Sequence, residues 1–315
     1  MQTGMTIRPA RPGDRPAMER ICAHTWEWGD YIPEAWDDWL DDEQGQLIVG
    51  ELEGRVVALS MIAFEAPGQI WLEGMRVDPE FRRRGVAGQF LDYSIALARE
   101  RGARVVRLGT SSRNAPVHTM TARAGMVCVG AYVLRIADPL PGGPRPAFLS
   151  VEHADQVRAF LRDSPVMTHT HGLYSAHWAW QELSPARIDQ FLEAGQFAAQ
   201  LAPDGRLAAM AGLHPDPEHK EIWASFAGGE AAAVTELATA VRGYAARLRA
   251  EKVQVMVPDL GWLRDALAEA GYGPGDWEGE LWIFERRLSG EAAGAAGGPA
   301  APSLGGSPGG GDRDS

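Results

Sequence analysis

The chain repeats one pattern of predicted elements, and this repeat constrains the fold more than any other feature. The segments "GQLIVGELEGRVVALSMIAF" (45–64) and "GQFAAQLAPDGRLAAMAGLH" (195–214) both begin with Gly-Gln and read as strand, tight turn, strand. In both copies an aromatic strand, a helix, a short apolar strand and a second helix follow, at an offset of about 150 residues. The repeat predicts an internal duplication of one unit that contains both helices and strands.

The first copy also indicates how its strands connect. Residues 85–101, "GVAGQFLDYSIALARER", place apolar side chains close to helical spacing. This predicted helix lies between the strands "WLEGMRV" (71–77) and "RVVRL" (104–108). Strand, glycine turn, helix, strand is the order of a parallel crossover unit. The predicted fold class is therefore α/β, with two tandem mixed-sheet domains.

Two composition breaks divide the chain. The segment "ADPLPGGPRP" (137–146) carries four prolines and two adjacent glycines, which interrupt helices and central strands. From Ser289 onward the residues are mostly Gly, Ala, Pro and Ser without periodicity, and such a segment buries too little apolar surface to become ordered. The predicted parts are a domain at 1–138, a linker at 139–147, a domain at 148–288 and a disordered tail at 289–315.

The net charge argues against several classes of partner. The 42 acidic residues against 30 Lys plus Arg give a formal charge of -12, which repels nucleic acid and anionic membranes and favours small molecules that carry an amine. Only two cysteines are present, so we expect neither disulfides nor a thiolate metal site. The N-terminus lacks a signal-like apolar run, and no stretch approaches about eighteen apolar residues. We expect a cytoplasmic protein, monomeric or homodimeric.

A glycine-rich turn with three arginines follows the strand that ends at Val77. It reads "DPEFRRRGVAG" (78–88), and Gly85 and Gly88 flank the predicted helix start. The first four backbone N–H groups of a helix have no intrahelical acceptor, and the helix dipole is positive there. Small residues at this end let phosphate oxygens approach the backbone. The turn predicts a diphosphate site; the alternative is a helix cap beside a solvated basic cluster.

Two motifs in this region resemble those of the GNAT superfamily of acyl-CoA-dependent N-acetyltransferases. The family signature is Arg or Gln, two residues, Gly, one residue, then Gly or Ala, which Arg82, Gly85 and Ala87 match. A second motif, Asn followed eleven residues later by Gly and an apolar residue, is matched at 114–126. The resemblance covers roughly residues 5–137 and implies acetyl-CoA as cosubstrate. Within the family, "DYIPEAWDDWL", "WLEGMRV" and "RRRGVAG" are similar to the histidine N-acetyltransferase-like group.

The resemblance also implies which residues hold the cosubstrate. The backbone of residues 75–77 would pair with the pantetheine arm, as an added strand pairs with a sheet edge, and the amides of residues 83–88 would hold the diphosphate. The binding residues implied in this way are Met75, Arg76, Val77, Arg82, Arg83, Arg84, Gly85, Val86, Ala87, Gly88 and Asn114. The second unit instead reads "ASFAGGEAAAVTEL", where Glu230 would repel a phosphate. We therefore expect one acetyl-CoA per chain and a second domain that lacks the CoA-binding loop.

Glu73 is the predicted general base, which would remove the proton of an ammonium acceptor. Strand alternation predicts that it shares a face with Met75, beside the expected thioester. GNAT enzymes often carry a catalytic glutamate on this strand, which supports the position by resemblance. The alternative is a structural carboxylate that pairs with Arg76 or Arg107.

The acid that protonates the leaving thiolate is harder to identify. By resemblance it would be a tyrosine seven residues after the motif asparagine, but Thr121 occupies that position. A threonine hydroxyl is too weak an acid for this role. The thiolate would leave with help from the helix N-terminus and water, or His118 or Tyr132 would be the donor.

A histidine-containing segment, "MTHTHGLYSAHW" (167–178), follows the predicted linker. His169, His171 and His177 could ligate a metal, but no cysteine or nearby carboxylate completes a ligand set. We therefore predict no metal. The aromatic and histidine side chains are expected to line the interface between the two domains.

The segment "HTWEWGDYIPEAWDDWLDD" (24–42) packs four tryptophans and seven carboxylates into nineteen residues. In a GNAT arrangement it would form two helices that wall the acceptor side of the cleft. We expect Glu27, Trp28, Asp30 and Tyr31 to bind the substrate, the acids by charge and the aromatic rings by cation–π contact. The second half reads as an amphipathic helix with its tryptophans facing inward.

Together these features predict an acetyl-CoA-dependent N-acetyltransferase that transfers an acetyl group directly to the amine of a small molecule in a ternary complex. The α-amine of a free amino acid is one candidate acceptor. Alternative acceptors are polyamines, aminoglycosides and protein lysines. The alternative from another class is a non-catalytic acyl-CoA sensor, which the missing tyrosine and the altered second unit would explain.

Overall fold

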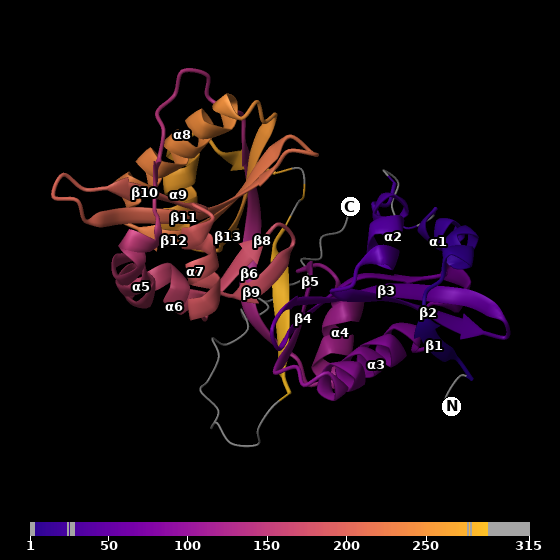
Figure 1. The fold of residues 1–315 in the computed structure, drawn as a ribbon. Coiled ribbons are helices and arrows are strands. Elements are labelled where there is room, and N and C mark those ends of the chain that lie inside the picture. Colours follow the sequence, from indigo (N-terminus) through magenta and orange to yellow (C-terminus); the bar gives the residue numbers. More distant parts are fainter. Residues whose placement is uncertain (1–3, 24, 26–28, 276, 278, 289–315) are drawn as a thin grey trace, which may run out of the picture.

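The computed structural model describes residues 4–23, 25, 29–275, 277 and 279–288. These residues form one 13-stranded mixed sheet and a separate two-stranded hairpin. The strand order in the large sheet is β1-β2-β3-β4-β5-β15-β6-β13-β12-β11-β10-β7, and β14 pairs with β6. Figure 1 shows two lobes, one built from the N-terminal half of the chain and one from the C-terminal half, that meet along this sheet.

The first unit runs from β1 to β6. Its strands are β1 (Thr6–Pro9), β2 (Gly45–Leu52), β3 (Arg55–Ala66), β4 (Gln69–Val77), β5 (Val105–Ser111) and β6 (Val127–Ala137). Its helices are α1 (Arg15–Cys22), α2 (Ile32–Asp41), α3 (Val86–Glu100) and α4 (Ala115–Arg123), with short 3-10 turns at Pro12–Asp14 and Pro79–Phe81.

The second unit repeats this order after an added segment of helices and a hairpin. Its strands are β7 (Ala147–Phe148), the hairpin β8 (Leu173–Ala176) and β9 (Ala179–Glu182), β10 (Phe197–Leu201), β11 (Leu207–Asp216), β12 (Glu221–Gly229), β13 (Lys252–Pro258), β14 (Gly273–Pro274) and β15 (Leu281–Arg287). Its helices are α5 (Ala154–Asp163), α6 (Pro165–His169), α7 (Pro185–Glu193), α8 (Ala231–Arg247) and α9 (Gly261–Glu269), with a 3-10 turn at Val151–His153.

The last strand of each unit pairs with the sheet of the other unit. Leu281–Arg287 of β15 pair antiparallel with Val105–Ser111 of β5, so β15 lies between β5 and β6. The second half of β6, Tyr132–Ala137, pairs with β13 of the second unit. In Figure 1 the yellow strand β15 stands between the two lobes. One sheet runs through both units, so it marks no boundary between them. The domain boundaries at 138 and 148 stay a prediction.

The two faces of the first unit carry different layers. On one face, α3 packs Phe90 and Ile95 against Ile62 of β3 and Ile70 of β4. Burial of this apolar stripe explains why residues 85–101 are helical, as their spacing predicts. The opposite face is covered by α1 and α2, where Trp36 is fully buried, and farther along by the β8–β9 hairpin.

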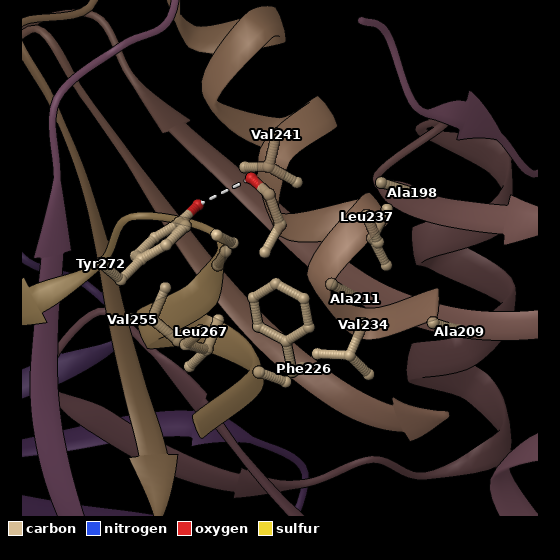
Figure 2. Packing of buried hydrophobic residues seen from close by; sticks show 14 of the residues in the cluster. Ala198, Ala209, Ala211, Phe226, Val234, Leu237, Val241, Val255, Leu267 and Tyr272 are labelled. Carbon is tan, nitrogen blue, oxygen red and sulfur yellow. Dashed lines mark hydrogen bonds between the residues drawn. The ribbon is translucent and has the colours of Figure 1, made fainter. Parts of the chain in front are cut away.

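The core of the second unit lies between its sheet and α8. Figure 2 shows Phe226 of β12 beside Val234 of α8, and Val255 of β13 beside Leu267 of α9. The Tyr272 hydroxyl donates a hydrogen bond of 3.2 Å to the Ala238 carbonyl, drawn as the dashed line. The second unit therefore has its own apolar core, although it shares strands with the first.

The predicted mixed α/β fold with tandem units is confirmed, and both predicted hairpins form, as β2–β3 and β10–β11. The helix predicted from "EAWDDWLDD" is α2, which buries Trp36 and half-buries Trp39. Within the described residues, no helix combines the length and apolarity that crossing a bilayer requires.

Candidate active site

The parallel strands β4 and β5 separate partway along their length. Gln69–Leu72 pair with Val105–Leu108, but the ladder stops there, although β4 continues to Val77 and β5 to Ser111. Beyond Leu72, the edge of β4 that faces β5 therefore has no strand partner among the described residues. Unpaired backbone groups at such an edge accept an added strand-like ligand. We call this region the β4–β5 splay.

A bulge at Gly74 accompanies the splay. The β3–β4 register shifts here, since Met61 pairs with Glu73 but Leu59 pairs with Arg76. Gly74 has a positive φ of 64°, and a Cβ at this position would lie 2.5 Å from the ring of Trp39 in α2. Only glycine fits this position without strain or a clash. The bulge thus seats α2 against the strand that carries Glu73.

The bulge overturns one expectation about side-chain direction. Strand alternation places Glu73 and Met75 on one face, but Met75 packs against the core under α3. Glu73 instead follows Trp71, which lies on the opposite face against the β8–β9 hairpin. An extra residue in a bulge reverses the alternation, which explains the difference. Met75 therefore faces the side of the sheet that α3 covers, and Glu73 faces the side that carries the β8–β9 hairpin.

The start of α3 has the shape of an anion cradle. Gly85 precedes the helix with a left-handed φ of 79°, and a Cβ at Gly85 or at Gly88 would meet no atom within 4 Å. Gln89 is the first helical amide that bonds to the Gly85 carbonyl. The described residues offer no acceptor to the amides of Val86, Ala87 or Gly88. These amides form the positive end of the 15-residue helix α3. These features fit a diphosphate.

The arginines of the turn lie around this cradle. All three, Arg82, Arg83 and Arg84, are exposed. The Arg82 Nε donates 3.2 Å to the Val77 carbonyl, which ties the turn to the end of β4. The Arg84 guanidinium lies 5.1 Å from the centre of the Phe81 ring. These guanidinium groups are placed to form hydrogen bonds and ion pairs with the phosphate oxygens of a ligand bound at the cradle.

Glu73 is half-buried on the acceptor side of the splay. Burial, followed by the negative charges of Glu65 and Asp42, raises the pKa of its carboxyl to about 7. A general base is most effective when its pKa lies near the working pH. The described residues show no ion pair between Glu73 and Arg76, whose guanidinium pairs with Asp30, or Arg107. The geometry supports the base over the structural alternative.

Arg107 has a different set of partners. It is 1% exposed and donates hydrogen bonds of 2.8 Å to Glu285, 2.7 Å to Gln69 and 2.9 Å to Glu182. These partners come from the exchanged strand β15, from β4 and from the β8–β9 hairpin. Arg107 therefore fastens three separate chain segments beneath the site.

The predicted acceptor residues fall into two groups. Glu27 and Trp28 lie outside the described residues. The Asp30 carboxylate is buried and forms a two-pronged pair with Arg76, with Nε–Oδ2 at 2.7 Å and Nη2–Oδ1 at 3.1 Å. Because Arg76 compensates its charge, Asp30 has little left to attract an ammonium group, and its position is that of an anchor for the segment beside Tyr31.

Tyr31 is placed where a substrate can reach it. Its side chain is 49% exposed, and its ring makes an edge contact with Trp39, centroid to centroid 5.9 Å. The Arg76 guanidinium lies 5.6 Å from the ring centre. Desolvation by the surrounding protein raises the pKa of the Tyr31 hydroxyl, with Glu73 as the next cause. Tyr31 and Glu73 therefore lie near each other, on the face of the sheet that α2 covers.

Asn114 and Thr121 belong to the region of α4, whereas the candidate acid Tyr132 lies elsewhere. Asn114 caps this helix: its Oδ1 accepts from the Val117 amide at 3.4 Å, and its Nδ2 donates to Thr110 at 3.1 Å. Thr121 is fully buried and donates to a carbonyl of its own helix. Tyr132 is buried against Trp180 on the other face of the sheet.

His118 is the candidate acid that lies closest to the splay. Its Nε2 is 3.0 Å from the carbonyl of Ser111, the last residue of β5, and its ring stacks on Trp282 of β15 at 4.8 Å. A carbonyl accepts only, so Nε2 carries the hydrogen and Nδ1 is open in the neutral ring. The role of His118 stays a prediction.

The second unit has a similar splay. β12 and β13 pair only over Glu221–Ala224 and Lys252–Val255. Beyond that point the Ala227 carbonyl accepts a hydrogen bond from Ser164, next to α6. A cavity of about 20 Å³ lies on one side of Ala227, and a larger one of about 340 Å³, lined in part by Ser164 and Glu230, lies at the start of α8. Glu230 is the residue before α8 and pairs with Arg206. The expected lack of a CoA-binding loop in the second unit stays a prediction.

The histidines of residues 167–178 lie apart from the site. His169 and His171 are exposed, and His177 contacts Trp223 at 5.6 Å between ring centroids. Among the described residues, no group of three His, Cys, Asp or Glu side chains is arranged to hold a metal. The interface prediction for this stretch applies to the hairpin residues rather than to these two exposed histidines.

Sequence reasoning did not identify Glu65, Asp42 or the hairpin residues Trp180 and Gln181 as parts of this site. Trp180 packs on Trp71 at 5.8 Å, and Gln181 donates 2.7 Å to Glu65. Gln181 and Glu65 are 116 positions apart, and no local pattern marks a contact at that separation. Only the folded arrangement of the two units brings them together.

Comparisons with known proteins agree on one family. The model of the acetyltransferase (GNAT) family matches residues 16–126. Histidine N-acetyltransferase of Oreochromis niloticus is 33% identical over 101 residues, which are 32% of this chain and 30% of that protein. The match thus spans about a third of this curated relative's length.

Solved structures extend the likeness to both units. A GCN5-related N-acetyltransferase from Sphaerobacter thermophilus superposes with a TM-score of 0.60 at 14% identity, covering 90% of this chain and 95% of that one. A tandem GNAT protein from the clavulanic acid biosynthesis pathway gives 0.50 at 15% identity, covering 91% and 100%. At these identities the likeness concerns the fold.

Proposed function

Because residues 16–126 match the model of the acetyltransferase (GNAT) family, we propose that this chain is an N-acetyltransferase that transfers an acetyl group from acetyl-CoA to the amine of a small molecule. The single observation that carries the proposal is the arrangement around the β4–β5 splay. An unpaired strand edge and an anion cradle lie on one side of it, and Glu73, with a pKa near 7, lies on the other.

The residues present fit acetyl-CoA as cosubstrate. Acetyl-CoA would supply the acetyl group as a thioester. The amides that begin α3 would bind its diphosphate, with charge from Arg82, Arg83 and Arg84, and the edge of residues 75–77 would bind the pantetheine. The Asn114 side chain already caps α4. Its contribution to acetyl-CoA binding would therefore be indirect, through the position of the start of that helix.

Glu73 would accept the proton that an ammonium acceptor must lose before its nitrogen can attack the thioester. Its carboxylate stands beside Tyr31, whose exposed ring offers an aromatic face to a cation. Trp39 of α2 packs closely against Gly74, the residue next to Glu73. The chain's own residues thus supply both a base and a surface that orients the amine.

The α-amine of a free amino acid is the first acceptor class to test. It is suggested by the similarity of the matched segment to a histidine N-acetyltransferase. Polyamines, aminoglycosides and protein lysines are the other acceptors to include, because the carboxylates Glu65 and Asp42 add negative charge near Glu73. A single acetyl-CoA per chain, a monomer or homodimer, a cytoplasmic location and the absence of nucleic-acid and membrane partners belong to the same proposal.

The test is an amine panel. The protein is incubated with acetyl-CoA and one amine at a time, free thiol is followed, and the product is identified by mass. We expect thiol release that depends on the amine and yields an N-acetyl product. Tight acetyl-CoA binding without release for any amine would favour the acyl-CoA sensor instead. Calorimetry that finds two equivalent acetyl-CoA sites would contradict the assignment of one site per chain.

A further inference from the structure

The β8–β9 hairpin of the second unit reaches across to the acceptor side of the first. Trp180 packs its ring against Trp71 of β4, and the Glu182 amide donates 2.8 Å to Gln69 Oε1. Trp71 and Glu73 lie on the same face of β4, two residues apart. The hairpin therefore packs on the face of β4 that carries Glu73, next to Trp71.

Gln181 makes the polar contact of this hairpin with the first unit. Its side chain is 2% exposed, and its Nε2 donates 2.7 Å to Oε2 of Glu65 on β3. Its Oε1 accepts from the Tyr174 hydroxyl at 3.3 Å, and that hydroxyl accepts from Arg187 Nε at 2.7 Å. The chain of hydrogen bonds fixes the direction in which the Gln181 amide points.

Glu65 is the last acceptor in this series of hydrogen bonds, and its negative charge affects the pKa of Glu73. It lies two residues after Ala63, which packs with Trp71 on the acceptor face, and its side chain is exposed. Its negative charge is the first charge that contributes to the raised pKa of Glu73. The described residues show no cation within ion-pair distance of Glu65. Burial raises the pKa of its carboxyl, and the charge of Arg187 opposes this shift without reversing it. Glu65 is therefore an exposed carboxylate that acts electrostatically on Glu73 and pairs with no cation among the described residues.

We propose that the second unit selects the amine acceptor: Gln181 is a positioning residue that orients Glu65 near Glu73, and Glu65 recognises acceptors whose distal part carries a hydrogen-bond donor or a positive charge. This inference rests on the proposed N-acetyltransferase function. It gives the second unit a role in the reaction of the first. It also explains why a buried glutamine on the hairpin points its donor across the interface.

The experiment compares amines that differ only at the distal end. Arginine and norleucine share an α-amine, and agmatine and 1-aminopentane share a primary amine; in each pair only the first carries a guanidinium group. We expect the wild type to prefer the guanidinium member of each pair. Gln181→Leu should reduce this preference about tenfold or more through the KM of the amine, because a hydrogen bond to a charged group is lost. The KM of acetyl-CoA should stay unchanged.

Gln254→Leu is the matched control. Gln254 is also a buried glutamine of the second unit, and its Nε2 donates 2.7 Å to Glu221. It should leave the preference intact. Gln181→Asn, which keeps a donor on a shorter side chain, should restore part of the preference.

Glu65→Gln tests the same contact from the first unit and decides the matter if Gln181→Leu does not fold. An unchanged ratio of the two kcat/KM values in Glu65→Gln, or in a folded Gln181→Leu, overturns the inference while leaving the N-acetyltransferase intact. Failure of the wild type to acetylate any amine of the panel overturns the proposed function and this inference with it.

Discussion

Glu73 and its neighbours form a small electrostatic unit. Burial and the charges of Glu65 and Asp42 favour the neutral form of the Glu73 carboxyl and raise its pKa to about 7. The base role was predicted from the strand on which Glu73 lies, but the source of this pKa was not, since Glu65 and Asp42 approach Glu73 only in the folded chain. The pairing of Asp30 with Arg76 was likewise invisible in the sequence, because either residue has many possible partners.

The first residue-scale prediction concerns the pH dependence of the wild type. Below a pH of about 7 Glu73 is protonated and cannot accept a proton, so kcat/KM should fall as the pH decreases through that value. Above it, Glu73 stays ionised and contributes no further change. Initial rates of thiol release between about pH 5 and 9 measure this limb. A limb near the ordinary glutamate value of 4.5 would count against the assignment.

Glu65→Gln should move the same limb to lower pH. Removing a negative charge near Glu73 makes ionisation of its carboxyl easier, so the base becomes available at lower pH. The matched control is Glu43→Gln, which removes a charge from an exposed residue that is not among those acting on Glu73. A limb that stays in place in Glu65→Gln, or moves equally in Glu43→Gln, would refute this interaction.

At the scale of elements, the start of α3 was the part of the site most readable from sequence. Its glycines and arginines are consecutive in the chain, and helix ends have the same orphan amides wherever they occur. The β-bulge could not be predicted from the sequence. The need for glycine at position 74 comes from the bulge itself and from the close contact with Trp39 of another element. For that reason alternation put Met75 on the wrong face, whereas the helical spacing of α3 was interpreted correctly.

Gly88→Val separates the two roles of this helix end. No atom lies within 4 Å of the position that a Cβ would take here, and valine has the better helix propensity, so the melting temperature should not decrease. The added methyl groups occupy the space expected for the diphosphate, so the Kd for acetyl-CoA should increase about tenfold or more. Calorimetry with acetyl-CoA and thermal unfolding of the same sample measure both. Loss of stability with unchanged affinity would place the diphosphate elsewhere.

At the scale of the whole molecule, the exchange of strands makes the two units one cooperative structure. β15 lies between β5 and β6, and Phe284 of β15 belongs to the core under α3. The sequence predicted the duplication from repeated patterns, but the residues of β15, "LWIFERR", carry no local sign of which sheet they join. Strand pairing between distant segments depends on the whole topology and cannot be derived from one strand.

A cut in the linker tests this exchange. A protease site inserted between Pro141 and Gly142, which are both exposed, should be cleaved without separating the two fragments. Each fragment supplies a strand to the sheet of the other, so they should co-elute on gel filtration until denaturant is added. An uncleaved sample of the same insertion variant is the reference. Separation of the fragments under native conditions would contradict the exchanged arrangement.

Acetyl transfer with Glu73 as the base is the central claim, and the variant Glu73→Gln tests it most directly. Glutamine keeps the shape of the side chain but cannot accept the ammonium proton, so kcat should fall by about 10²- to 10⁴-fold. The Kd for acetyl-CoA, measured by calorimetry on the same preparation, should stay within about twofold, because Glu73 lies on the acceptor side of the splay. Equal losses of turnover and acetyl-CoA affinity, or full turnover by the variant, would contradict the account.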